Sequence, residues 1–259
     1  MPADSPVDTP VVTRAGRRAL IGAACAGLLL AGCAGPQAGQ RPAGGRTPAA
    51  SAPAPGAPAL TAPAEIPGIG PATRARIPGS SSQALVVKGD GPHAHQSTAV
   101  LYERDPATGW KAVSQPWPAH NALRGWTADH RAGDLRSPIG VFALGDAGGR
   151  LPDPGTKLPY DRSEEFNMPG TGFLGEPLEG SFDHVVAIDY NRVPGTSPLN
   201  KVRPLGAAKG GGVWIHVDHG GPTRACVSLR RDDMRRLLLA LDPAKEPVIV
   251  MGDTGTLGR

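Results

Sequence analysis

The sequence predicts a mainly β domain with one clear helix and long loops, and three observations carry this prediction. Short apolar runs are separated by Gly and Pro turns, a single stretch has apolar residues at helical spacing, and residues 145–180 show almost no period. The expected strands are Ala84–Val87, Ala99–Glu103, Gly140–Leu144, His184–Tyr190, Val213–Val217 and Val248–Met251.

The segment RRDDMRRLLLALDP predicts the helix. Asp232 and Asp233 stand in its first turn, where carboxylates complement the helix dipole, and Pro243 marks its end. One apolar face follows from the i, i+3, i+4, i+7 spacing of Met234, Leu237, Leu238 and Leu241. In contrast, residues 145–180 are rich in Pro and Gly. We expect them to form long ordered loops of the kind that build substrate clefts.

Residues 1–32 predict an export signal. Arg14, Arg17 and Arg18 precede an apolar run from Ala19 to Ala31. The run is too short for a permanent membrane-spanning helix, which needs roughly 20 residues. Paired arginines are also similar to a twin-arginine signal, so the Sec and twin-arginine routes both stay open.

The apolar run ends in Leu30-Ala31-Gly32-Cys33, which resembles the lipobox of bacterial lipoproteins. This resemblance implies that Cys33 is acylated and begins the mature chain. An ordinary cleavage site with an incidental Cys33 is the alternative. We therefore expect a membrane contact through a lipid anchor and a lipoprotein that faces the cell wall.

The chain after the signal divides into a tether and one domain. Residues 33–76 are mostly Ala, Pro and Gly without a period, which predicts a lipid anchor followed by a disordered tether. Residues 77–259 are then one domain, long enough for a substantial core. The net charge is +4 and aromatic residues make up 4%, without a basic stripe interleaved with aromatics, so we expect no nucleic-acid partner and a monomer.

Cys226 is the cysteine that matters for chemistry. Cys25 lies inside the signal and Cys33 would carry lipid, so Cys226 is left as the free thiol of the mature protein. An unpaired cysteine in an exported protein is a candidate for a reactive group, because oxidising compartments disfavour idle thiols. A small buried cysteine without a role is the alternative interpretation.

The stretch IHVDHGGPTRACVSL surrounds Cys226 with the groups that activate a thiol. His216 lies near the end of a predicted strand, and the Gly220-Gly221-Pro222 turn lets the chain fold back toward Cys226. A neighbouring histidine or helix N-terminus lowers the pKa of a thiol, and backbone N–H groups near Ala225 suit an oxyanion. A metal site of His216, Asp218, His219 and Cys226 is the rival chemistry; we disfavour it because His219 should point away from the other two strand residues.

The segment GVWIHVDHGGPTRACVSLRRDDMRRLL is similar to the catalytic motif of L,D-transpeptidases of the YkuD-like family. That motif joins a strand-borne histidine to a Ser/Thr-x-Gly-Cys sequence, matched here by Thr223 to Cys226 except at Ala225. The segments SPIGVFAL, HVVAIDYN and PGTKLPY resemble further family segments. The resemblance covers roughly Ala84 to Gly252.

This resemblance implies an L,D-transpeptidase-like β-sandwich with the helix after the nucleophile motif. It implies that Cys226 attacks the diaminopimelate carbonyl of a peptidoglycan tetrapeptide stem, expels D-alanine and forms a thioester, with His216 as the base. An amine, or water in an L,D-carboxypeptidase reaction, then takes the acyl group. No metal or organic cofactor is implied. A catalytically impaired lipoprotein that binds peptidoglycan with the same fold is the alternative function.

Five residues are candidates for the oxyanion or substrate-lining positions. They are Thr223, Arg224, Ala225, His219 and His184. For His219 we expect a solvent-exposed loop position, and for His184 a structural or cleft-lining role rather than a catalytic one. Ala225 replaces the family's glycine; we expect ordinary backbone geometry there rather than a strained positive φ.

Overall fold

The computed structural model describes residues 64–259, and everything stated below concerns that part of the chain. The expected signal, Cys33 and the first part of the expected tether lie outside it. No helix formed by residues 64–259 is both long and apolar enough to cross a membrane.

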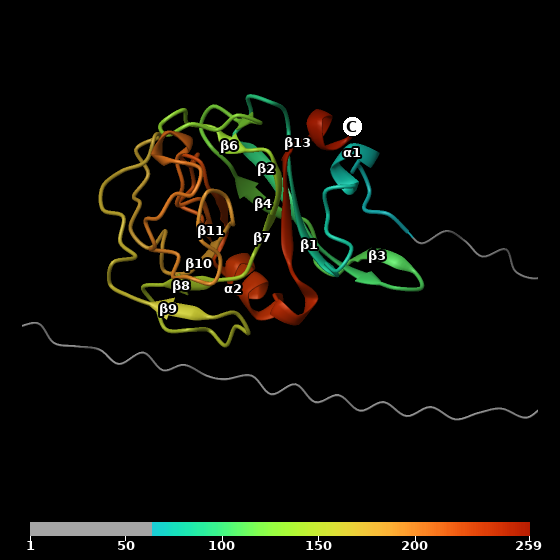
Figure 1. Ribbon diagram of the computed structural model, residues 1–259. Helices are drawn as coiled ribbons and strands as arrows, with labels where there is room; N and C mark the ends of the chain where they lie inside the picture. Colours follow the sequence, from blue (N-terminus) through green and yellow to red (C-terminus); the bar gives the residue numbers. More distant parts are fainter. Residues whose placement is uncertain (1–63) are drawn as a thin grey trace, which may run out of the picture. The chain divides into compact units, whose positions relative to one another are not determined.

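The predicted mainly β fold is confirmed as one curled mixed sheet (Figure 1). Its strand order is β7-β13-β1-β2-β4-β12-β11-β10-β8-β9, and β3 pairs with β2 outside this path. A separate parallel pair joins β5 (Trp126–Thr127) to β6 (Ser137–Pro138). The strands of the large sheet are β1 (Gln83–Gly89), β2 (Gln96–Asp105), β3 (Gly109–Ala112), β4 (Trp117–His120), β7 (Gly140–Ala143), β8 (Ala147–Gly149), β9 (Tyr160–Arg162), β10 (Val185–Ala187), β11 (Trp214–Val217), β12 (Val227–Leu229) and β13 (Val248–Asp253).

The parallel strands β1 and β13 form the buried centre of the fold. Both carry nearly continuous apolar sequence, as expected for strands covered on both faces. Leu85 and Ile249 enter the larger hydrophobic core, whereas their neighbours Val86 and Val250 enter a second core on the opposite face. Successive side chains of β1 and β13 point to opposite faces, so this pair of strands contributes to both cores.

The predicted helix is confirmed as α2, Arg231–Ala240. Met234, Leu237 and Leu238 are buried in the larger core, and Leu241 follows the helix as another core residue. Asp233 of the first turn is buried and paired with Arg230 at 3.0 Å and Arg236 at 2.9 Å. A 3₁₀ turn, Pro243–Lys245, follows the end of the helix.

The expected boundary between tether and domain at residue 76 is too late in the chain. Ile66 and Ile69 are 3% and 6% exposed and belong to the second core, and α1 (Pro71–Arg74) follows them. Figure 1 shows the C-terminus beside α1, where the N–H of Ala72 donates to the carbonyl of Arg259 at 3.0 Å. Two isoleucines in an Ala/Pro/Gly-rich stretch have no period, so only their tertiary contacts reveal that the fold includes them.

The expectation of loops throughout residues 145–180 also needs correction. The strands β8 and β9 lie there as a parallel pair, and β8 continues the sheet from β10. The strand expected over His184–Tyr190 is shorter, Val185–Ala187. Strands of three residues are too short to show a period, and the Ala-Gly-Gly sequence of β8 has low strand propensity.

Candidate functional site

Strands β11 and β12 bring His216 and Cys226 to one face of the sheet. They pair in parallel, with Ile215 opposite Val227 and His216 opposite Ser228. Ile215 and Val227 point into the larger core, so the alternate positions on this part of the sheet face the other way. Gly220, at φ 84°, supplies the left-handed turn that the connecting loop needs.

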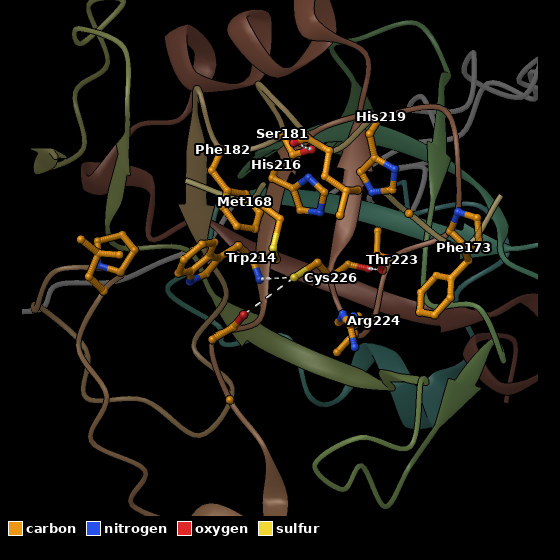
Figure 2. A pocket seen from close by; sticks show the side chains of 18 of the residues that line it. Met168, Phe173, Ser181, Phe182, Trp214, His216, His219, Thr223, Arg224 and Cys226 are labelled. Atoms are coloured by element: carbon orange, nitrogen blue, oxygen red, sulfur yellow. Dashed lines mark hydrogen bonds between the residues drawn. The ribbon is translucent and has the colours of Figure 1, made fainter. Parts of the chain in front are cut away.

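This face opens into a cavity of about 450 Å³. Figure 2 shows Cys226 in the middle of it, with His216 and Met168 on one side and Arg224 on the other. The walls come from loops at residues 168–182 and 198–212, the β11 strand and the loop before β12. Its lining residues include Cys226, His216, His219, Trp214, Phe182 and Arg224.

The Cys226 thiol is held by backbone groups. Its sulfur accepts from the N–H of Trp214 at 3.4 Å and donates to the carbonyl of Gly212 at 3.7 Å. Burial raises the pKa of Cys226 to about 11, and the Trp214 hydrogen bond lowers it only in part. In the resting site the sulfur is therefore a neutral thiol at physiological pH.

His216 presents a neutral ring to the same cavity. Its Nδ1 lies 2.9 Å from the carbonyl oxygen of Val217, which only accepts, so Nδ1 carries the proton and Nε2 is left as a base. The edge of Phe182 packs on the ring at 5.3 Å between centroids. Burial lowers the pKa of His216 to about 4. Within residues 64–259 no hydrogen bond joins His216 to Cys226, so the resting pair is thiol and imidazole rather than an ion pair.

Two hydroxyl groups fix the backbone at Cys226. Thr223 Oγ1 donates to the carbonyl of Cys226 at 2.7 Å, and Ser137 Oγ donates to the same oxygen at 3.2 Å. Ser137 also accepts from the N–H of Ala122 at 3.0 Å. Thr223 lines the cavity as expected. The SPIG segment, in which Ser137 stands, thus acts on the site through its first residue.

Ala225 lines the cavity in ordinary backbone geometry. Among residues 64–259, positive φ at non-glycine positions occurs at Leu135, Asn191 and Glu246, and Ala225 is not one of them. The alanine at this position therefore carries no left-handed strain.

The expected solvent-exposed position of His219 is wrong. Its side chain is 6% exposed, lines the cavity and stacks on His216 with ring centroids 5.7 Å apart and planes at 11°. Its Nδ1 lies 3.2 Å from Glu176 Oε1. The residue follows the end of β11, where the chain turns at Gly220, and strand alternation no longer decides its direction.

His184 and Arg224 differ in their relation to the cavity. His184 is not among its lining residues; it is buried and hydrogen-bonded to the Tyr160 hydroxyl at 3.0 Å, so the substrate-lining assignment is wrong and a structural role stands. Arg224 is exposed and lines the cavity, with its guanidinium 5.6 Å from the centre of the Phe173 ring.

Sequence reasoning missed Glu176, which lies in the long segment expected to form loops. A Cβ at Gly172 or at Gly221 would each lie 2.0 Å from its Oε1 atom, so both glycines make room for this carboxylate. Lys201 and Arg203 were also missed; with Arg224 they place three cations around the cavity. The glycines were the available signal, but a glycine in sequence does not say which side chain it admits.

The metal alternative does not fit the contacts. Asp218 accepts from Ser228 Oγ at 2.6 Å and lies 2.8 Å from His120 Nδ1, so its Oδ1 atom is already engaged. In the part of the chain that the structure describes, no group of three His, Cys, Asp or Glu side chains is arranged to hold a metal ion. His219 nevertheless does not point away from His216 as expected, since the two rings stack.

No family model, curated protein or solved structure matches this chain. Fold and site define the class of protein by themselves: a mainly β domain with a cavity lined by one thiol and two histidines.

Proposed function

We propose that this domain is a cysteine acyltransferase and, in line with its motifs, a peptidoglycan L,D-transpeptidase. The observation that supports the proposal best is the placement of His216 on β11 and of Cys226 directly before the paired strand β12, both facing one cavity, with His216 Nε2 unprotonated. A nucleophile, a base and a cavity for a peptide are the parts that acyl transfer needs.

The neutral resting pair determines how the first step proceeds. Because the pKa of Cys226 is raised and that of His216 is lowered, a free thiolate beside an imidazolium is disfavoured. Proton transfer from sulfur to Nε2 accompanies attack on the substrate carbonyl. The C–N bond then breaks, the proton goes to the leaving D-alanine amine, and a thioester remains on Cys226. We assign the N–H groups of Ala225 and Cys226 to the oxyanion.

The charges around the cavity support an anionic substrate. Lys201, Arg203 and Arg224 line it, whereas Glu176, the carboxylate nearest His219, is paired with that ring. Stem peptides carry several carboxylates, and guanidinium groups bind carboxylates in a bidentate geometry. Water or an amine completes the reaction, so L,D-carboxypeptidase activity belongs to the same proposal.

A catalytically impaired lipoprotein that binds peptidoglycan is the second candidate. The observation in its favour is the raised pKa of Cys226 together with the missing hydrogen bond to His216 among the described residues. In that case the cavity binds stem peptides without forming a thioester.

Intact-mass analysis with a carbapenem separates the two candidates. The wild-type protein should gain the mass of one carbapenem, and Cys226→Ala and Cys226→Ser should gain none, since a hydroxyl without activation is a far weaker nucleophile than a thiol. A wild-type protein that binds muropeptides but gains no mass would identify the impaired binder.

The location in the cell envelope is also proposed. It depends on Cys33, which lies outside the described residues. The variant Cys33→Ala should leave the membrane fraction or fail to mature, because two acyl chains anchor a protein stably. Unchanged fractionation of this variant with membranes would contradict the lipoprotein proposal.

A further inference from the structure

His219, which lines the cavity, and Glu176, which is not among the lining residues but contacts the His219 ring, form a second polar pair that the reaction described above does not use. Their side chains are 6% and 11% exposed, and His219 Nδ1 lies 3.2 Å from Glu176 Oε1. The other carboxylate oxygen accepts from the N–H of Leu174 at 2.7 Å. The backbones of Gly172 and Gly221 approach the carboxylate so closely that neither position has room for a Cβ atom, and Glu176 is confined to this position.

The hydrogen bonds to Glu176 determine which nitrogen of His219 is free. Burial raises the pKa of Glu176, but hydrogen bonds from backbone N–H groups and from His219 outweigh it, and the net pKa is lowered. An ionised carboxylate only accepts, so His219 Nδ1 donates to it and Nε2 is left as a base. A carboxylate behind an imidazole orients the ring and stabilises the cation that forms when the ring takes a proton.

The two stacked histidines therefore have different partners. His216 donates to the neutral carbonyl of Val217, and no ion pair to its ring occurs within residues 64–259. His219 donates to a carboxylate in direct contact. The His219 ring therefore has a carboxylate on its Nδ1 side, whereas the His216 ring has only a backbone carbonyl there.

We propose that His219, oriented by Glu176, is the base that takes the proton of the acceptor amine in the second half of the reaction. This inference rests on the proposed function. The amine nitrogen attacks the thioester carbonyl, the C–S bond breaks, and Cys226 leaves as thiolate. The proton of the amine goes to His219 Nε2, and a proton returns from the imidazolium to the sulfur, which restores the resting thiol. Glu176 is a positioning residue in this scheme.

The other titratable and charged groups near the pair come from three elements. They matter because a pH profile reports all of them. His120 on β4 reaches the site through its 2.8 Å contact with Asp218, whose Oδ2 atom accepts from the N–H of Gly220 beside His219. These groups are His216 and Asp218 at the end of β11, His120 on β4, and Arg224 and Cys226 on the loop before β12. Lys201 and Arg203 line the same cavity from the loop at residues 198–212.

The test measures the two half-reactions separately in the full chain. Wild type, His219→Gln and Glu176→Gln are compared with Glu179→Gln, which removes the same charge from an exposed position outside the cavity. Adduct formation with a carbapenem reports acylation. A disaccharide tetrapeptide as donor and D-methionine as amine report exchange, followed by mass spectrometry between about pH 5 and pH 9.

We expect exchange to fall about 100-fold in His219→Gln and about tenfold in Glu176→Gln, the usual scale for loss of a base and of its orienting group. Acylation should fall at least tenfold less than exchange. The loss in Glu176→Gln should fall on exchange rather than on acylation across this pH range, because the amide no longer orients the His219 ring. Glu179→Gln should match the wild type in both half-reactions.

Equal losses of acylation and exchange would overturn the inference and make His219 a residue that only shapes the cavity. Exchange at the wild-type rate in His219→Gln would overturn it as well. Failure of the proposed function looks different, because the wild-type protein itself would then form no carbapenem adduct, and this inference would fall with it.

Discussion

The two halves of the curled sheet are built in different ways. In the half formed by β7, β13, β1 and β2, the last three strands have 6, 7 and 10 residues, and β13 is buried over its whole length. In the half formed by β12, β11, β10, β8 and β9, each strand has three or four residues. Most of the glycines with positive φ lie between residues 149 and 220, in the loops of this second half.

The two halves differ in what their side chains contact. The first half carries apolar side chains on both faces, so its free energy comes from burial. The second half exposes one face to the cavity, and polar side chains there form hydrogen bonds, as at His216, Thr223 and Glu176. Both halves share the larger core through Ile215, Val227 and Leu85, which keeps the irregular half in place.

The largest effect should come from His216 in the cavity half. His216→Ala removes the base facing Cys226, and we expect acylation by a carbapenem to slow by roughly 10²–10⁴. The matched variant His93→Ala, an exposed histidine outside the cavity, should change the rate less than threefold. Stopped-flow or mass-based adduct kinetics provide the measurement. Similar losses in both variants would contradict the role of His216.

The next effect tests the buried half. Leu85 is 0% exposed in the larger core and Leu205 is 64% exposed. The same truncation at the two positions therefore measures the contribution of burial. Leu85→Ala should lower the free energy of unfolding by about 2–5 kcal/mol, and Leu205→Ala by less than about 0.5 kcal/mol. Urea denaturation measures both. A small loss at Leu85 would mean that the central strands do not dominate stability.

A smaller effect concerns the thiol in alkali. The pKa of Cys226 is raised from 9.0 to about 11, so the folded protein keeps a proton that the unfolded chain releases between these values. Its contribution to stability is complete below pH 9 and is lost as pH rises toward 11. The thiol is partly accessible from the cavity. Between pH 9 and pH 11 we therefore expect wild type to lose about 1–2 kcal/mol more unfolding free energy than Cys226→Ala. Urea denaturation at pH 9 and at pH 11 measures this change. An equal change in unfolding free energy in the two proteins would refute the prediction.

The smallest effect concerns Ala225. Its φ is not positive, so Ala225→Gly relieves no strain and adds freedom to the unfolded chain. The variant should lose about 0.5–1 kcal/mol of unfolding free energy. Urea denaturation measures the change. The control variant Gly180→Ala should also destabilise the domain, because Gly180 has a φ of 80°, which favours glycine. A stabilised Ala225→Gly would mean that the backbone at 225 is strained after all.

The regular half could be predicted well from sequence. The strands β1, β2, β7 and β13 and the helix α2 follow from apolar patterns that local periodicity reveals. The short strands β8 and β9 could not be predicted, because three residues carry no period. Ile66 and Ile69 were assigned to the tether for the same reason, since their burial depends on Trp110 and Leu257 far along the chain.

The candidate nucleophile and base of the site could be predicted from sequence, because Cys226 and His216 stand in one short motif whose Gly and Pro turn predicts the fold-back. The other features of the site depend on the three-dimensional fold. It placed His219 against His216 and Glu176, removed His184 from the cavity, and anchored the Cys226 carbonyl on Ser137. These contacts join segments distant in the chain, and a side chain's direction in a loop depends on what packs around it rather than on the residues beside it in sequence.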